Sequence, residues 1–330
     1  MEEESSVRFG LNVDHVVSGG PYHCVFDNSL KPRVRVHPGQ VVRIDCIEAA
    51  GGQLTPASTL ENANSIDGSK VHTISGPIYI EGAEPGDTLV IDILDIRHHG
   101  WAWTHVLNGF GSLAERFCGQ TDFRIWHVDD GNFASVLQGV KVPVEPFCGV
   151  MGVAPKESGP IITIPPRAIG GNMDCKHLRP GTRVYFPVCV PGALFSIGDG
   201  HLAQGDGEVC GTALEGPVDV IVRLDLIKNK PIKAVWFESF EAQDAPIESQ
   251  GNFVTTSTGQ DLQQLTTDVV SAMVDLLIEK FTLEPMEAYI ICSAAGNLKI
   301  SVPVLGPRHA GMVTFHMPKS IFSKSIERGS

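Results

Sequence analysis

Residues 85–94 read Pro-Gly-Asp-Thr-Leu-Val-Ile-Asp-Ile-Leu, a turn followed by a run of β-branched and other apolar residues. Proline presets φ at the first corner of a turn, and glycine supplies the positive φ that the next corner of a type II turn requires. The same Pro-Gly pattern, at 38–39 and 180–181, precedes strand-like runs at residues 41–47 and 183–188. Each copy of the pattern predicts a turn that leads into a strand.

Strand signals continue through most of the first 240 residues. Further candidate strands span residues 78–81, 218–226 and 232–237, and the whole chain carries 35 glycines and 22 prolines. Short strands at close spacing, separated by many turns, favour a sandwich or a barrel. We therefore expect residues 1–240 to form a mainly β portion.

After Phe253, the spacing of apolar residues no longer indicates strands. Apolar residues recur at helical spacing between Asp261 and Phe281, which predicts an amphipathic helix. A second helix is expected to begin at Glu284-Pro285 and to end at Gly296, because proline is tolerated in the first turn and glycine ends helices. A strand is expected at residues 299–304. Residues 241–330 are therefore predicted to be an α+β portion packed on the first.

The amino-acid composition argues against binding to nucleic acid or to an anionic membrane. The 330 residues include 38 acidic and 25 basic side chains, a net charge of -13, and no lysine or arginine cluster that would attract nucleic acid or an anionic membrane. The acidic amino terminus does not resemble a secretory signal, and no apolar run is long enough to span a bilayer. We expect a soluble, cytoplasmic protein. Its eight cysteines include no Cys-x-x-Cys pair and are expected to be free and mostly buried.

The most informative segment for chemistry is Gly198–Glu208, which reads Gly-Asp-Gly-His-Leu-Ala-Gln-Gly-Asp-Gly-Glu. Glycines beside Asp199 and Asp206 permit unusual backbone conformations and close approach of an ion or a small polar molecule. In an extended chain, side chains at i and i+2 share a face, so Asp199 is expected to pair with His201, and Asp206 with Glu208. Such ligands suit a divalent cation such as zinc, with one carboxylate left to carry protons. The alternative is a tight acidic loop whose carboxylates cap backbone N–H groups.

Two other segments supply candidate ligands. Asp174 ends a glycine-rich loop at residues 169–174, and His72 precedes a turn and a strand. Turn capping by Asp174 and a structural hydrogen bond at His72 are the alternatives. Asp45 and Glu48 end the first Pro-Gly strand, where the mouth of a polar pocket can lie, although solvated strand-end acids are the simpler account.

Several other motifs are set aside. His98 and His99 point to opposite faces of a strand, and two tryptophans lie between them and His105, so these histidines are not expected to form a metal cluster. Cys175 and Cys210 flank the polar segments, but nothing in the sequence indicates a lowered thiol pKa. The sequence has no nucleophile elbow, no phosphate-binding loop and no zincin helix. Metal-assisted hydrolysis fits the remaining carboxylates and histidines best.

Taken together, these motifs resemble the acetamidase/formamidase family, whose members hydrolyse short amides to the carboxylate and ammonia. The resemblance extends from about His23 to Phe322. The matching segments are His23 with Phe26–Pro32, His72 with Gly76–Asp87, Gly149–Pro155, Gly170–Asp174, Val190–His201 and Gln204–Gly211.

The resemblance implies a jelly-roll-like β sandwich with an added α+β portion, a metal such as zinc, and often a dimer. The polar residues that fall inside matching motifs are His72, Asp174, Asp199, His201, Asp206 and Glu208, and Asp45 and Glu48 occupy places where the family carries acids with the two types exchanged. Asn297 and Lys299 depart from a family pattern of aspartate and arginine. If the aspartate and arginine of the family form a structural ion pair, Asn297 and Lys299 keep a weaker polar contact in its place. If they serve the reaction, the activity of this protein is in doubt.

The sequence therefore suggests a metal-dependent amidohydrolase for a small neutral amide such as formamide or acetamide. The divalent metal is expected to be held by some of His72, Asp174, Asp199 and His201, while Glu208 or Asp206 passes a proton to the departing ammonia. A homodimer or a higher even-numbered homo-oligomer is expected. The alternative is a non-catalytic β-sandwich protein that binds a carbohydrate or another small molecule and contains a structural metal.

Overall fold

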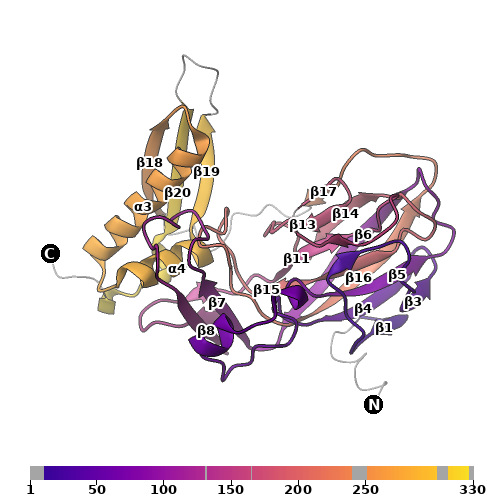
Figure 1. Cartoon of the computed structure of the whole chain (residues 1–330), viewed down its shortest axis with the longest axis horizontal. Helices are drawn as coiled ribbons and strands as arrows, with labels where there is room; N and C mark the ends of the chain where they lie inside the picture. Colours follow the sequence, from indigo (N-terminus) through magenta and orange to yellow (C-terminus); the bar gives the residue numbers. More distant parts are fainter. Residues whose placement is uncertain (1–10, 131, 165, 240–250, 303–310, 327–330) are drawn as a thin grey trace.

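Two β-sheets form the main body of the molecule, at the right of Figure 1. The computed structural model describes residues 11–130, 132–164, 166–239, 251–302 and 311–326. The six-stranded sheet contains, in spatial order, β1 (His15–Val17), β4 (Val41–Cys46), β16 (Val218–Ile227), β6 (Thr88–His98), β14 (Thr182–Pro187) and β17 (Trp236–Ser239). The five-stranded sheet contains β13 (Gly170–Asn172), β11 (Phe147–Gly152), β15 (Phe195–His201), β5 (Ile74–Ile80) and β3 (Val34–Val36).

The Pro-Gly turns lead into strands as predicted. Gly39, Gly86 and Gly181 have φ values of 90°, 97° and 90°, the conformation that glycine adopts without steric cost. They precede β4, β6 and β14, which all belong to the six-stranded sheet. Side chains alternate along β4, with every second one buried between the sheets. The candidate strand at 232–237 begins later than expected, because regular pairing with β14 is confined to β17.

Smaller sheets extend this body. One has four strands, β10 (Val142–Pro143), β9 (Phe133–Ser135), β8 (Asp122–Val128) and β7 (Trp101–Val106), and another pairs β12 (Ile161–Ile162) with β2 (Val25–Phe26). The short helix α2 (Leu60–Asn64) begins at Thr59, whose side chain accepts a hydrogen bond from the Asn62 amide. Short 3₁₀ segments span Gly68–Lys70, Lys319–Ile321 and Lys324–Ile326.

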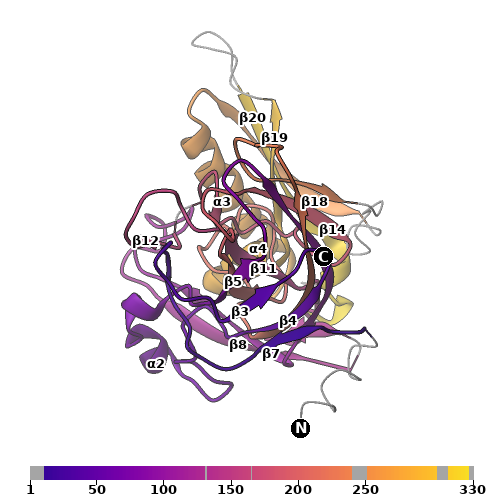
Figure 2. The ribbon, with the colours of Figure 1, turned by 90° about the vertical axis from the view of Figure 1, so that its right-hand side faces the viewer.

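The carboxy-terminal part is α+β. A three-stranded sheet, β18 (Asn252–Gly259), β20 (Gly311–Pro318) and β19 (Asn297–Val302), lies beside α3 (Leu262–Lys280) and α4 (Pro285–Ala295), as Figures 1 and 2 show. Asp261 caps α3 by accepting hydrogen bonds from two amides of its first turn, and proline opens α4. The mainly β fold with an α+β carboxy-terminal portion is thus confirmed. The part of the expected strand at 303–304 lies outside the described residues.

One buried apolar cluster joins the two parts of the molecule, since it includes Ile197 and Val222 of the sandwich as well as Leu265 and Tyr289 of the helices. The Tyr289 hydroxyl donates to the Val209 carbonyl at 2.5 Å and accepts from the Leu113 amide at 3.0 Å. The helices therefore pack directly on the loops that follow β15 and β7. The expected boundary between the portions, at residue 240, falls outside the described residues.

Within the described ranges, no helix is both long enough and apolar enough to cross a membrane. The eight cysteines are free thiols, as the sequence predicts.

Candidate active site

Three of the predicted ligands converge near the centre of the molecule. One potential ligand atom from each of Asp174, Asp199 and His201 lies within 4.8 Å of the other two. Asp174 Oδ1 is 4.0 Å from His201 Nε2. His72 adjoins them, with Nδ1 at 3.3 Å from Asp199 Oδ2. The structure therefore brings together all four candidate metal ligands, which come from three separate segments of the chain.

Four strands of the five-stranded sheet, β13, β11, β15 and β5, position these groups. Strand β15 carries Asp199 and His201, and it pairs with β11 on one side and β5 on the other. His72 lies just before β5, where its amide donates to the Ala49 carbonyl at 2.8 Å. Asp174 follows β13, and its amide donates to the carbonyl of Gly149 on β11 at 3.3 Å. Backbone hydrogen bonds in and beside the sheet thus fix the position from which each ligand side chain extends.

Gly149 provides the space in which these side chains meet. A Cβ atom added there would lie 2.5 Å from Asp174 Oδ1, 2.5 Å from His201 Cε1 and 2.6 Å from Asp199 Oδ2. Contacts this short are prohibited by van der Waals repulsion, so only glycine permits the convergence. The glycines on either side of Asp199 serve the sheet instead, because a Cβ at Gly198 or Gly200 would lie within 2.6 Å of a neighbouring backbone oxygen.

Four of the eight described non-glycine residues with positive φ belong to the site. His72, Asp174, Asp199 and Glu208 have φ values of 55°, 43°, 58° and 42°, a left-handed region that costs a residue with a side chain about 1–2 kcal/mol. The strain therefore falls on the candidate site residues themselves and not on the glycines beside them. Strain of this kind persists where the surrounding structure imposes it, and it clusters at functional sites.

His201 is oriented by a contact on one face of its ring and by another at one nitrogen. Its ring stacks on Phe147 with 4.7 Å between the ring centroids, and Nδ1 lies 2.9 Å from the carbonyl oxygen of Asp199. A carbonyl oxygen only accepts hydrogen bonds, so Nδ1 carries a proton and donates it. Nε2 is then the nitrogen that faces Asp174 and can bind a metal through its lone pair.

Two glutamates complete the group around His201. Nε2 of His201 lies 3.5 Å from Glu208 Oε1 and 3.3 Å from Glu215 Oε1. Glu215 is held by paired backbone hydrogen bonds with Trp103 of β7, and its side chain accepts from the Ala213 amide at 2.8 Å. We refer to His72, Asp174, Asp199, His201, Glu208 and Glu215 as the His201 cluster.

Burial and close charges shift the pKa values in this cluster. Burial, reinforced by neighbouring carboxylates, raises the pKa of Asp174 to about 8, and burial raises that of Glu208 to about 7 despite the nearby imidazole of His201. Burial opposes ionisation of Asp199 as well, but His72 and His201 hold its pKa at about 2. For His72, burial is outweighed by Asp199, and its pKa rises to about 9. The cluster without a metal therefore retains protons at neutral pH.

Several polar atoms of the cluster are buried without a hydrogen-bond partner among the described residues. They are His72 Nδ1, Asp174 Oδ1 and both carboxylate oxygens of Asp199. Buried polar atoms are normally paired, and unpaired carboxylate oxygens beside imidazole nitrogens form a donor set that suits a divalent metal. Asp174, Asp199 and His201 can therefore hold a metal ion.

The cluster opens into a cavity of about 540 Å³. Besides the six cluster residues, the lining includes Ile66, Trp103, Leu107, Phe110, Ile164 and Thr266. Thr266 belongs to α3, so the carboxy-terminal part contributes to the wall. His105 also lines the cavity, although it is not expected to bind a metal. Its Nε2 lies 3.2 Å from both Asn64 Oδ1 and Thr121 Oγ1.

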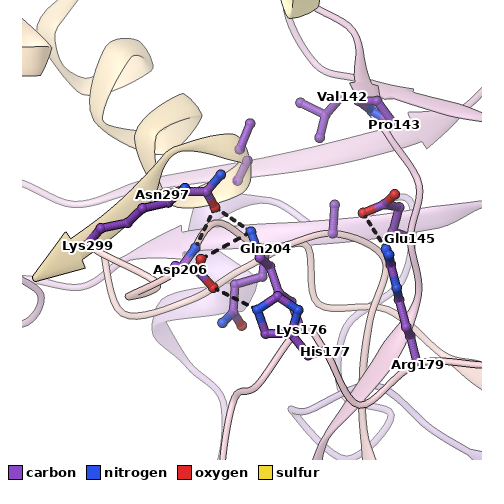
Figure 3. A pocket seen from close by; sticks show the side chains of 13 residues that line it. Val142, Pro143, Glu145, Lys176, His177, Arg179, Gln204, Asp206, Asn297 and Lys299 are labelled. Atoms are coloured by element: carbon purple, nitrogen blue, oxygen red, sulfur yellow. Dashed lines mark hydrogen bonds and ion pairs between the residues drawn. The ribbon is translucent and has the colours of Figure 1, made fainter. Parts of the chain in front are cut away.

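Asp206 lies in a different cavity, of about 340 Å³, shown in Figure 3. Its carboxylate lies 3.4 Å from Lys176 Nζ and 3.9 Å from His177 Nε2, and its amide donates to Asn297 Oδ1 at 3.1 Å. The expectation that Asp206 and Glu208 share a face is wrong, because residues 206–207 form a turn and not extended chain. Asn297 and Lys299 line this second cavity too, away from the His201 cluster.

Asp45 and Glu48 have other surroundings. Asp45 lies 3.2 Å from Arg43 Nη2 and does not line the cavity. Glu48 is buried and accepts hydrogen bonds from the Ala50 and Gly52 amides, both at 2.6 Å, and from Trp103 Nε1 at 3.0 Å. With three donors, this carboxylate positions Trp103 at the cavity wall. It is not a solvated strand-end acid.

The two candidate thiols are poorly suited to act as nucleophiles. Burial raises the pKa of Cys210 to about 11 and also raises the pKa of Cys175, which favours the protonated thiol in both cases. Neither residue lines the cavity that contains the His201 cluster.

Sequence reasoning missed Glu215 and Gly149. Glu215 belongs to the apolar segment Ala213-Leu214-Glu215-Gly216-Pro217, where a single acid before a Gly-Pro turn is the only local signal. Gly149 reads as an ordinary glycine in a strand, which at most suggests a close approach. Gln204 was missed as well, and its side-chain amide donates to the Asp174 carbonyl at 2.7 Å.

Comparison with known proteins identifies the family. The model of the Acetamidase/Formamidase family matches residues 17–160 and 158–324. A formamidase from Methylophilus methylotrophus is 30% identical over 291 residues, covering 70% of this chain and 71% of that protein. An acetamidase from Mycolicibacterium smegmatis is 30% identical over 286 residues, covering 66% and 70% of the two chains.

Solved structures share the fold over nearly the whole chain. A gamma lactamase from Delftia acidovorans superposes with a TM-score of 0.85 at 24% identity, covering 94% of this chain and 93% of that one, a likeness that concerns the fold alone. An acetamidase from Bacillus halodurans has a TM-score of 0.64 at 28% identity, covering 92% and 96%. The chain therefore belongs to the acetamidase/formamidase family and is a hydrolase of short amides.

Proposed function

We propose that the chain hydrolyses small neutral amides of the formamide and acetamide type to the carboxylate and ammonia, and that this activity depends on a divalent metal, zinc, at the His201 cluster. The formamidase and acetamidase relatives support the substrate class. The observation that carries the metal is the convergence of Asp174 Oδ1 and the Asp199 carboxylate with His201 Nε2 around the space beside Gly149, where these buried oxygens accept no hydrogen bond from the described residues.

Asp174, Asp199 and His201 would hold the ion, with His72 beside them. A divalent cation bound there lowers the pKa of water and polarises the amide carbonyl. The chain supplies the geometry for this chemistry, since the Asp199 carbonyl fixes the tautomer of His201 and Phe147 fixes the plane of its ring.

Glu208 is the residue that we assign to proton transfer. Its carboxylate lies 3.5 Å from His201 Nε2, beside the proposed metal, and burial favours its protonated form, as suits a group that accepts a proton and gives it back. Water adds to the carbonyl carbon while Glu208 Oε1 takes one of its protons. The same carboxyl then gives this proton to the amide nitrogen as the C–N bond breaks, which releases ammonia and the carboxylic acid.

The surrounding charge favours a neutral substrate. Carboxylates of Asp174, Asp199, Glu208 and Glu215 line one cavity. Once the product acid ionises, repulsion by these carboxylates promotes its release.

The test combines metal content with turnover. Purified protein is expected to contain about one equivalent of zinc and to release ammonia from formamide or acetamide, and chelation is expected to abolish release until zinc is restored. Glu208→Gln is expected to retain the metal and lose turnover. A structural metal in a non-catalytic binding protein would instead lower the melting temperature on removal, with no ammonia from any short amide under any metal condition.

The proposal includes a cytoplasmic location and a homodimer or a higher even-numbered assembly. Val254 of β18 and Ile300 of β19 are exposed on the outer strands of the three-stranded sheet, where another copy can pair or pack. Measurement of the molar mass in solution tests this expectation.

A further inference from the structure

The cavity at the His201 cluster is much larger than a short amide needs. Its volume of about 540 Å³ lies within the range of roughly 300–1,000 Å³ that is typical of sites for larger organic ligands. Formamide occupies roughly the volume of two water molecules, at about 30 Å³ each. Most of the cavity would remain filled with water around such a substrate.

The wall outside the cluster is mainly apolar. Its larger apolar side chains are those of Ile66, Val71, Trp103, Leu107, Phe110 and Ile164, and the larger polar ones are those of His105 and Asn172. Binding is favoured when an apolar group of the ligand covers an apolar wall, because apolar surface is then removed from water. The lining thus matches a ligand with a hydrocarbon part, while the His201 cluster supplies the polar groups that act on the amide.

Three of these apolar side chains are solvent-exposed at the cavity. The exposed fractions are 40% for Leu107, 55% for Phe110 and 41% for Ile164. Large apolar side chains that are exposed together around a cavity are characteristic of ligand sites. Leu107 and Phe110 belong to one turn, closed by a hydrogen bond from the Phe110 amide to the Leu107 carbonyl at 3.2 Å.

The Phe110 ring is held in place by its surroundings. It lies directly over Gly211, where an added Cβ would be 2.3 Å from the ring, and φ at that glycine is +90°. The preceding residues are fixed by Asn108, whose side-chain oxygen accepts from the Gly119 amide at 2.8 Å. A preorganised ring that is still half exposed offers a binding surface at little cost in conformational entropy.

From these observations we infer that the protein accepts neutral amides with a cyclic, branched or aromatic hydrocarbon group of about the size of a leucine or phenylalanine side chain, and that Phe110, with Leu107 and Ile164, determines this specificity. The inference rests on the proposed amide hydrolysis and extends its substrate range. The hydrocarbon group replaces water along the apolar wall, and the amide group remains at the His201 cluster.

The first experiment compares formamide, acetamide, butyramide, cyclohexanecarboxamide and benzamide as substrates of the purified zinc-loaded protein. The expected result is a KM that falls by about fourfold for each methylene buried, with the lowest values for the ring-bearing amides. Highest kcat/KM with formamide or acetamide, and a steady decline for larger amides, would overturn the inference while leaving the proposed function intact. Failure to release ammonia from every member of the series would overturn the proposed function.

The second experiment uses variants of Phe110, one of the exposed apolar residues at the rim of the cavity. Phe110→Ala is expected to raise KM for benzamide about tenfold more than KM for acetamide, and Phe110→Leu is expected to restore most of the difference. Phe133→Ala, at an exposed phenylalanine on β9 outside this cavity, is the matched control and is expected to change neither KM. An equal effect of Phe110→Ala on both substrates, or a change in molar mass that shows the rim to be a contact between copies, would contradict the inference.

A binding measurement separates recognition from turnover. Benzamide is expected to bind the Glu208→Gln variant at least tenfold more tightly than acetamide, measured by calorimetry. Equal or weaker binding of benzamide would contradict the inference even if the wild-type protein hydrolyses short amides.

Discussion

Glu215 Oε1 lies 3.3 Å from His201 Nε2, the nitrogen that faces the cluster of candidate metal ligands. Backbone pairing of Glu215 with Trp103 and with His201 holds the carboxylate in this position. Glu215→Gln keeps the side-chain length and an oxygen for the Ala213 amide but removes the charge beside the imidazole. Because Glu215 Oε1 faces the nitrogen that would bind the ion, loss of its charge is expected to lower zinc affinity by about 10–100-fold, which competition with a chromogenic chelator measures. Unchanged affinity would show that the Glu215 carboxylate does not contribute to the metal site.

Gly149 is expected to tolerate no side chain. In Gly149→Ala, the new methyl group would collide with Asp174, Asp199 and His201, although φ at this position is compatible with alanine. Overpacking of this kind costs about 1–3 kcal/mol of unfolding free energy, and zinc binding and amide turnover should be lost with it. Denaturant unfolding and metal titration measure the two effects.

Gly68→Ala is the control for this substitution. Among the described residues, no atom lies within 4 Å of a Cβ added at Gly68, and its φ is also compatible with alanine. This variant should match the wild type in stability, metal content and turnover. Full zinc occupancy in Gly149→Ala would contradict the convergence of ligands beside Gly149.

The two acids of the Asp206–Glu208 segment should behave differently. Glu208→Gln is expected to reduce kcat by about 10²–10⁴-fold, the range for loss of a general acid–base group. Asp206→Asn removes a charge that pairs with Lys176 in the other cavity, so kcat should change by less than about threefold and stability by at most about 1 kcal/mol. Steady-state ammonia release compares the variants. A large loss of kcat in Asp206→Asn alone would reverse our assignment of proton transfer.

The metal-free protein should lose stability as pH rises. The folded pKa of Asp174, about 8, lies above its ordinary value of 3.8, and that of His72, about 9, lies above 6.5. A raised folded pKa means that the folded state binds more protons than the unfolded state, so its contribution is complete below the ordinary pKa and is lost as pH rises through the folded pKa. Asp199, with a folded pKa of about 2, acts in the opposite direction only below about 3.8.

Zinc must displace these protons, so its affinity should increase over the same interval. The difference in Tm between zinc-loaded and metal-free protein is therefore expected to widen from about pH 6 to about pH 8.5. Thermal unfolding at several pH values, with Asp174→Asn as the comparison, measures this change. A difference in Tm that is constant across the interval would show that metal binding is not coupled to Asp174 and His72.

Local patterns were sufficient to predict several elements of the fold. The Pro-Gly turns before β4, β6 and β14, and the boundaries of α3 and α4, depend on φ preferences and capping between residues a few positions apart. Such features need no knowledge of the rest of the molecule. The meeting of Asp199 and His201 was also predicted, but Asp199 has a φ of 58° and is not extended, so the alternation of side chains along a strand does not by itself account for it.

The same reasoning did not extend to the Asp206–Glu208 segment or to Glu48. Asp206 and Glu208 are separated by a turn that sends their carboxylates into different cavities, and Glu48 is saturated by donors that include Trp103, 55 residues away. A pattern of alternating residues applies only where the chain is extended, and the sequence does not specify which distant donors reach a buried carboxylate.

The sequence alone determined the mainly β architecture, the carboxy-terminal helices and the identity of His72, Asp174, Asp199 and His201 as candidate ligands, because turn chemistry, periodicity and ligand types are local properties. Only the tertiary structure decided that these four residues meet, three of them beside Gly149, that Glu215 joins them and that Phe110 lines the cavity. These relationships join segments far apart in the chain. They arise from the packing of sheets and helices, whose buried contacts outweigh the backbone strain that local preferences alone would avoid.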